Sequence, residues 1–296
     1  MVDNAMQRET TTTGHDELRR KRRLHSWAKY LQVFGTFARN SLIRDMTFRV
    51  DFIIQLISST SFVIMNLGFY LLIYQYTNSI AGWSQFEFFV FIATTMLVNS
   101  MVQAFFMPNV QEFSELIRTG NLDFALLKPI DTQFLISLQK VSWPSLGNFG
   151  VALILLFYSL GHLSDGAPSW AGMLLYPVYV LAGASILYSV MIALAATSIW
   201  LGRNQSLYDF WFYITNFSRY PMGIYDGRWG TPMRQVFTFL IPILIVINVP
   251  AGILAKPLDP AYWELALFAV VATIVSFWAS RLVFQKALRS YRSASS

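Results

Sequence analysis

The chain has 296 residues, of which 55% are hydrophobic and only 13% are charged. A soluble domain carries about 25% charged residues, so this composition excludes an ordinary soluble fold. The absence of cysteine excludes a disulfide framework and a thiolate metal site. The formal charge of +6 is concentrated at the two ends, which is typical of membrane topology and argues against a nucleic-acid partner.

Hydrophobic residues occur in long runs that contain no Asp, Glu, Lys or Arg. These runs cover 52–86, 88–111, 141–164, 166–202, 235–255 and 265–280. A helix that spans a bilayer needs about 20 such residues. The runs therefore predict an all-α, polytopic membrane protein, with residues 51–290 forming a single transmembrane domain.

The N-terminal region is expected to stay outside the bilayer core. Residues 1–23 are polar, end in the basic run RRKRR and predict a disordered cytoplasmic tail. Residues 24–50 follow with apolar side chains at a spacing of three and four: Leu24, Trp27, Leu31, Phe34, Ala38 and Leu42. This pattern predicts an amphipathic helix in the membrane interface, with its basic side towards anionic head groups.

Five crossings can be placed from hydropathy, at about 52–74, 88–107, 139–160, 172–200 and 262–282. The loops 75–85 and 161–169 contain no Lys or Arg, whereas both chain ends are basic. Basic residues are retained on the cytoplasmic side, so both termini are expected in the cytoplasm. This requires an even number of crossings.

The region 203–260 must then supply one further crossing, and it offers two candidates. Residues 206–221 are short and contain Asp209 and Arg219, whereas residues 235–255 are uncharged. The charge rule favours 235–255 as the crossing. Its Pro242, Asn248 and Pro250 instead favour a re-entrant hairpin, which is tolerated where protein covers the backbone. Hydropathy alone leaves both possibilities open.

A charged segment, 108–130, separates the second and third crossings. Its first part has one apolar face, formed by Val110, Phe113, Leu116 and Ile117, and Gly120 follows as a helix-terminating glycine. Up to residue 131, four acidic residues oppose two basic ones, which is unusual for a cytoplasmic loop. An acidic amphipathic hairpin there favours a protein partner; the alternative is a surface helix whose polar face is merely solvated.

The sequence ELIRTGNLDFALLKPID (115–131) resembles the signature loop of bacterial ABC transporter permeases of the type-2 (O-antigen-export-like) class, in its branch of short inner-membrane permeases. Further matches are RDMTFRVDF (44–52), SRYPMGIY (218–225) and FLIPILIVINVPA (239–251). The resemblance implies six crossings, an interfacial connecting helix at 24–50 and a cytoplasmic coupling helix at 108–130. It also implies that 206–222 is the fifth crossing and 235–255 an external re-entrant hairpin, which places Arg219, Arg228 and Arg234 outside.

The resemblance further implies that the coupling helix docks on an ATPase subunit. The polar contacts expected in this docking are Glu112, Glu115, Arg118 and Asp123. The apolar contacts expected are Leu116, Ile117 and Leu122. The chain has no Gly-Lys-Ser or Gly-Lys-Thr sequence, so ATP and magnesium are expected on the partner, with no cofactor and no catalytic residue in this chain.

These observations predict the permease subunit of an ATP-driven exporter in a bacterial inner membrane. It would work as a homodimer, or as a heterodimer with a sister permease. Alternatives are an integral membrane lipid-modifying transferase and a membrane scaffold without transport activity. The outer loops offer the transferase only scattered polar residues: His162, Asp165, Asp259 and Glu264. Nothing in the crossings identifies the substrate.

Overall fold

The computed structural model describes residues 28–47, 49–163, 168–201, 205–257 and 259–291, with side chains omitted from 201 to 209. Within these ranges the structure is built from helices and contains no β-strand, as predicted. The expected tail (1–23) and the start of the expected interfacial helix (24–27) lie outside the described residues.

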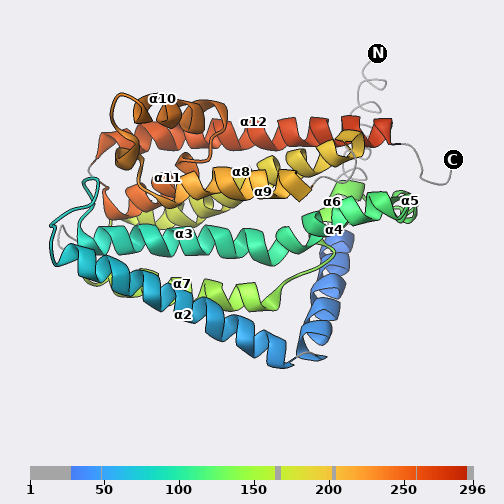
Figure 1. The fold of residues 1–296 in the computed structure, drawn as a ribbon, viewed down its shortest axis with the longest axis horizontal. Coiled ribbons are helices and arrows are strands. Elements are labelled where there is room, and N and C mark those ends of the chain that lie inside the picture. Colours follow the sequence, from blue (N-terminus) through green and yellow to red (C-terminus); the bar gives the residue numbers. More distant parts are fainter. Residues whose placement is uncertain (1–27, 48, 164–167, 202–204, 258, 292–296) are drawn as a thin grey trace, which may run out of the picture.

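Five helices are long and apolar enough to cross a membrane, and they lie side by side along the long axis of the molecule (Figure 1). They are α2 (Arg49–Tyr74), α3 (Gln85–Phe105), α7 (Trp143–Leu160), α8 (Trp170–Leu201) and α12 (Pro260–Ser290). α7 begins later than the predicted third crossing, because Pro144 lacks an N–H group and fits only the first helical turn. α3 is largely buried, whereas α2 has no buried residue and lies at the edge of the bundle.

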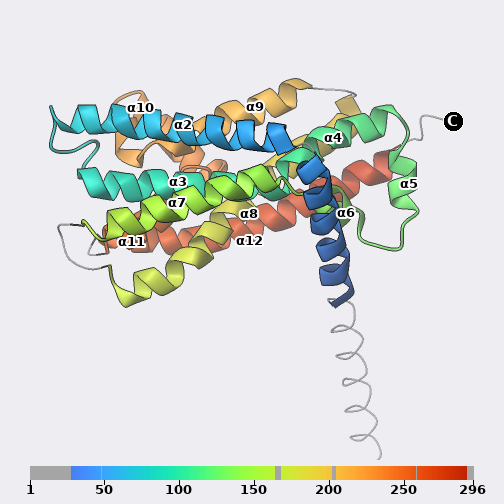
Figure 2. The ribbon, with the colours of Figure 1, turned by 90° about the horizontal axis from the view of Figure 1, so that it is seen from below.

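One end of the bundle carries a group of short helices, and we call it the α5 end. It contains α4 (Met107–Arg118), α5 (Leu122–Leu126) and α6 (Thr132–Leu138). A helix formed by residues 28–47, here called the N-terminal helix, lies across the bundle axis at this end (Figures 1 and 2). The opposite end, which we call the α10 end, carries the loop between α2 and α3.

The segment between α8 and α12 first runs towards the α10 end and then folds back. It consists of α9 (Gln205–Asn216), η1 (Phe217–Arg219), η2 (Met222–Tyr225), α10 (Gly230–Gln235), the π-helical turn η3 (Val236–Leu240) and α11 (Ile245–Ala255). The pair formed by residues 230–240 and α11 is bent by 92°.

The residues that precede and follow this bent pair, in η2 and after α11, lie at the same turn of the α2–α3 loop. A Cβ atom on Gly223 would lie 3.2 Å from the carbonyl oxygen of Ala81, and Lys256 donates a hydrogen bond to the carbonyl of Gly82. The bent pair therefore enters and leaves at the α10 end as a hairpin. α9, η1 and η2 connect the α5 end of the bundle to its α10 end. By length and composition the described residues offer five spans, or six if the bent pair is one span, so the choice between 206–222 and 235–255 as the fifth crossing stays a prediction.

The hairpin tolerates its polar and proline residues because protein surrounds it. Every residue of α11 is buried, and the helix packs against α3, α8 and α12. Asn248 accepts a hydrogen bond from the Met222 N–H at 2.8 Å and donates one to the Leu244 carbonyl at 2.8 Å. Its amide is thus satisfied inside the bundle, as a buried polar group must be.

The three arginines that this arrangement puts towards the α10 end are accommodated individually. Arg234 forms an ion pair with Asp226. The other two lie over aromatic rings, Arg219 at 5.7 Å from the Phe212 centroid and Arg228 at 5.8 Å from that of Trp229. Cation–π contacts of this kind partly compensate a guanidinium for lost hydration.

Candidate functional site

The charged segment forms an amphipathic helix, α4, that continues α3 with a change of direction. Pro108 occupies the first turn of α4, where a missing N–H costs nothing. Val110 and Phe113 are buried, so the predicted apolar face is confirmed. Gly120 has φ +73° directly after the helix, which confirms its role as the terminating glycine. Phe113 packs against Phe284 of α12, with ring centroids 5.9 Å apart.

The apolar residues expected to contact a partner lie mostly inside the protein. Leu122 is 0% exposed, and Leu116 and Ile117 pack against the core. The exposed apolar side chains of the segment are instead on α5 and its end, with Phe124 at 69% and Leu127 at 80% exposed. Leu122 is buried because the chain turns back at the glycine, which directs the start of α5 into the bundle.

The four polar candidates all have interactions within the chain. Glu115 and Arg118 form an ion pair one helical turn apart, and this hydrogen bond raises the pKa of Arg118. Glu112 pairs with Lys140 at 2.5 Å. Asp123 lies near the phenol of Tyr291, and burial together with the negative charge of Asp123 raises the pKa of that phenol. Among the described residues, no group of His, Asp or Glu side chains is arranged to hold a metal ion.

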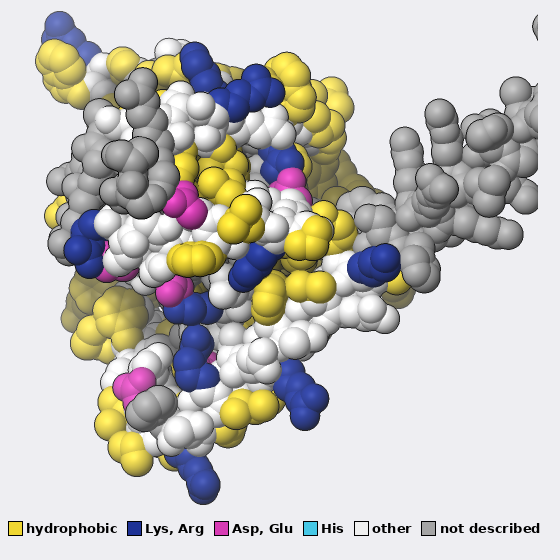
Figure 3. Space-filling view, turned by 90° about the vertical axis from the view of Figure 1, so that its right-hand side faces the viewer, with side chains coloured by type: hydrophobic (Ala, Val, Ile, Leu, Met, Phe, Trp, Pro, Cys, Tyr) yellow, Lys and Arg dark blue, Asp and Glu magenta, His cyan; other side chains and the backbone are white. Residues whose placement is uncertain are grey.

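Figure 3 shows the α5 end of the molecule, where basic, acidic and hydrophobic side chains are mixed on one surface. The exposed ion pair Glu115–Arg118 and the exposed Phe124 and Leu127 contribute to this end. A surface with exposed apolar side chains beside charges of both signs is suited to a protein partner.

The chain between α5 and α6 is fastened to the last crossing. Asp131 forms an ion pair with Arg281 of α12, and the same guanidinium donates to Gln133 Oε1 at 2.8 Å. Asp131 also caps α6 by accepting the Phe134 N–H at 3.0 Å. Burial raises the pKa of Asp131, but the hydrogen bonds from Arg281 and from the start of α6 outweigh burial and lower it.

The fourth crossing joins the same network through one buried tyrosine. The hydroxyl of Tyr188 on α8 accepts a hydrogen bond from Gln133 Nε2 at 2.9 Å and lies 2.7 Å from the hydroxyl of Ser137. Sequence reasoning did not find this network, because Arg281 reads simply as a basic residue after the last crossing. The only available signal was a polar run, Asp131 to Gln133, at the start of an apolar helix.

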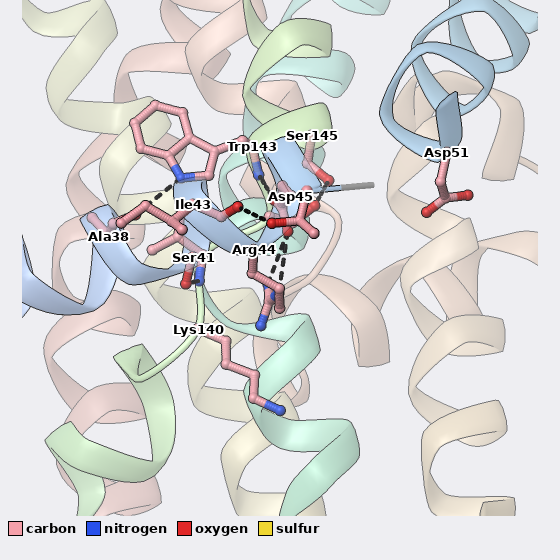
Figure 4. Close-up of polar contacts among 12 residues, drawn as sticks. Ala38, Ser41, Ile43, Arg44, Asp45, Asp51, Lys140, Trp143 and Ser145 are labelled. Atoms are coloured by element: carbon pink, nitrogen blue, oxygen red, sulfur yellow. Dashed lines mark hydrogen bonds and ion pairs between the residues drawn. The ribbon is translucent and has the colours of Figure 1, made fainter. Parts of the chain in front are cut away.

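The N-terminal helix is attached to the start of α7 by three hydrogen bonds (Figure 4). Trp143 donates through Nε1 to the Ala38 carbonyl at 3.1 Å and through its N–H to Asp45 Oδ2 at 3.2 Å. The Val141 N–H donates to the Ser41 hydroxyl at 3.1 Å. Part of the predicted apolar stripe therefore faces protein, while Leu31, near the start of the helix, remains exposed.

A comparison with protein families bears on the whole bundle. The model of the family described as "ABC-2 family transporter protein" matches residues 60–295. The chain belongs to the ABC-2 transporter family. The match includes the segment 108–130 and the hairpin, and confirms the resemblance found in the sequence. No curated protein and no solved structure gives a significant match.

Membership of the ABC-2 family makes this chain a multi-pass membrane permease of an ABC transporter. Such permeases are transport components that generally do not carry out catalysis themselves, and an ABC ATPase partner is implied in general.

Proposed function

We propose that this chain is the permease subunit of an ATP-driven exporter, with its α5 end in the cytoplasm against a separate ATPase subunit. Both chain ends would then be cytoplasmic, and the membrane would be a bacterial inner membrane. The permease would act as a dimer with a second copy or with a sister permease. ATP and magnesium would be bound by the ATPase, since this chain contains no Gly-Lys-Ser or Gly-Lys-Thr sequence.

The observation that carries this proposal is the mechanical connection of the α5 end to three crossings. α4 continues directly from α3, Phe113 packs against Phe284 of α12, and Asp131 pairs with Arg281 of the same helix. Tyr188 connects α8. A displacement imposed on α5 would reach these crossings through contacts that are already formed, because packed interiors transmit strain.

The docking surface is best assigned to α5 rather than to the core-facing side of α4. Phe124 and Leu127 are the most exposed large apolar side chains of the segment, and Leu126 beside them is 39% exposed. Apolar side chains that enter a pocket on a partner dominate binding energy, whereas exposed ion pairs at the rim contribute little. We expect Phe124 and Leu127 to be the anchors, and Glu115 and Arg118 to contribute mainly to specificity.

Co-purification of the ATPase tests this assignment. Leu127→Asp should lower the amount of ATPase recovered with the permease by about tenfold or more, since burying an unpaired carboxylate costs over about 1.4 kcal/mol. The exchange Glu115→Arg with Arg118→Glu should have a smaller effect. Trp229→Asp, at an exposed residue of the α10 end, is the matched control and should change nothing.

Full recovery of the ATPase with Leu127→Asp and Phe124→Ala would overturn the docking assignment. Absence of any P-loop ATPase in the wild-type preparation would instead contradict the exporter proposal itself and favour a membrane scaffold. Membrane levels of each variant, measured by immunoblot, separate weakened docking from failed insertion.

A further inference from the structure

One side of α3 carries a row of polar residues beside the partly exposed Ile92 and Met96. In the middle and second half of this largely buried helix, Thr95 and Asn99 are partly exposed and Gln103 is exposed. Residues four apart share one face of a helix, so the three form a row. The Thr95 hydroxyl donates to the carbonyl one turn earlier, but the amides of Asn99 and Gln103 have no side-chain partner among the described residues.

A second polar row lies on α2. Gln55, Ser59 and Asn66 are spaced by four and seven residues, and Tyr70 follows four residues later on the same face. Tyr70 contacts Phe88, which precedes the polar row on α3, with ring centroids 4.7 Å apart. The two rows therefore adjoin at this aromatic contact.

From the aromatic contact towards the α5 end, α2 leaves α3. Figure 1 shows the two helices diverging in this direction, and α2 packs instead against α7, where Leu56 meets Gly147. Gln55 and Gln103 are exposed, whereas Ser59, Asn66, Thr95 and Asn99 are partly covered by the rest of the described chain. The open region begins at Tyr70 and Phe88 and extends towards the end where the ATPase is proposed to dock.

The chemistry of these rows does not suit lipid. An amide without a hydrogen-bond partner in hydrocarbon costs several kcal/mol, so Asn99 and Gln103 require water or another polar group. The polar groups on α2 place fewer demands on a partner, because the Asn66 amide and the Ser59 hydroxyl donate to carbonyls of their own helix. Side chains that already form hydrogen bonds within their own helix can exchange external hydrogen-bond partners at little cost. Such rows suit a surface along which a transported molecule moves.

We propose that these two rows line a hydrated path for the uncharged, hydrogen-bonding part of the transported molecule. We call them together the polar face: Gln55, Ser59 and Asn66 of α2 with Thr95, Asn99 and Gln103 of α3. The inference rests on the proposed transport function. None of the six side chains carries a charge, so the path selects hydroxyl or amide groups; the one carboxylate bonded to the rows is Asp51, which accepts a hydrogen bond from Gln55 at 2.8 Å at the start of α2. Tyr70 against Phe88 closes it at the α10 end in this conformation.

The chain contains no cysteine, which permits a direct test by thiol labelling of the complete permease in inside-out vesicles. Single cysteines at Asn99 and Gln103 should react with the membrane-impermeant reagent 2-(trimethylammonium)ethyl methanethiosulfonate. We expect rates at least tenfold above that of Ile154→Cys, a 72%-exposed position on α7 that serves as the lipid-facing control. If Asn99→Cys does not reach the membrane, Thr95→Cys replaces it.

Labelling of Asn99→Cys and Gln103→Cys as slow as that of Ile154→Cys would overturn the proposal. So would an Asn99→Cys disulfide between two chains together with exclusion of the reagent, because the face would then be a dry interface. The anionic 2-sulfonatoethyl reagent tests the uncharged lining. The ratio of the labelling rates of the cationic and anionic reagents at these cysteines should equal the ratio measured with a small thiol in solution. A tenfold departure from that ratio in either direction would contradict a neutral path.

Recovery of the ATPase with the same cysteine variants keeps the two proposals separable. Loss of ATPase from the wild-type chain would remove the exporter function whatever the labelling pattern. Normal recovery with an unlabelled Asn99→Cys would remove only the path.

Discussion

Asp131 stabilises the α5 end in two ways, and substitutions can separate them. As the N-cap of α6 it contributes about 1 kcal/mol, the usual cost of replacing such a residue by alanine. Its ion pair with Arg281 is about one-third exposed on both sides. Exposed pairs contribute up to about 1 kcal/mol and breaking a buried pair costs about 3–5, so this pair lies between, at about 1–2 kcal/mol.

These magnitudes predict an ordered series. Asp131→Ala loses both contributions and should cost about 2–3 kcal/mol of unfolding free energy. Asp131→Asn keeps a good N-cap and should cost about 1–2 kcal/mol. Arg281→Gln should add little to Asp131→Asn, because the pair is already broken, which gives a coupling energy of about 1–2 kcal/mol in a double-mutant cycle.

Thermal unfolding of the purified permease in detergent is the assay. With about 2–4 °C per kcal/mol for a chain of this size class, alanine should lower the midpoint by about 4–12 °C and asparagine by about half as much. Equal effects of alanine and asparagine would show that the cap contributes nothing. An unchanged midpoint for Asp131→Asn, or additive single effects, would refute a stabilising ion pair.

The pH dependence provides a second check of the same pair. The pKa of Asp131 is lowered in the folded protein, so its contribution is present above the unfolded pKa and is lost as the pH falls through the folded value. The difference between wild type and Asp131→Asn should therefore be constant from about pH 8 to pH 5 and shrink below about pH 4. A difference that grows on acidification would contradict the assignment.

Two further changes probe the hairpin and its attachment. Gly252→Ala should destabilise the protein by more than about 2 kcal/mol, because the new Cβ would lie 2.1 Å from the Tyr262 ring. Gly150→Ala is the control, since no atom lies within 4 Å of a Cβ placed there. Equal unfolding midpoints for the two variants would refute close packing at Gly252. Lys256→Met should lower the free energy of unfolding by about 2–3 kcal/mol, because it leaves the nearly buried Glu87 without its cation. Adding Glu87→Gln should restore part of this stability. If the double variant is no more stable than Lys256→Met, the unpaired charge is not the cause.

Much of this fold follows from patterns that are local in the sequence. Uncharged runs of sufficient length predicted the long helices, and spacing of three and four predicted the buried face of α4 at Val110 and Phe113. Gly120 was identifiable because a left-handed residue after a helix favours glycine. Each of these predictions depends on neighbours within one or two helical turns.

The parts that could not be predicted depend on contacts between distant residues. Asp131 meets Arg281 across 150 positions, and Trp143 meets Asp45 across 98, with no local pattern to announce either pair. Leu122 looked like a surface anchor because its helix has only five residues, too few for a periodicity to reveal the buried side. Hydropathy could not distinguish the hairpin from a crossing, because a segment buried in protein is as apolar as one buried in lipid.

The hairpin also provides a place to add sequence without altering the topology of the chain. Its outer turn is open: no atom lies within 4 Å of a Cβ placed on Gly227, and Trp229 is 82% exposed. Because the segment enters and leaves at one end of the bundle, a peptide tag inserted at Gly227 would remain on that side and leave the direction of α12 unchanged. Antibody access to such a tag in intact cells would report the orientation of the whole permease from an internal position, with both termini left native.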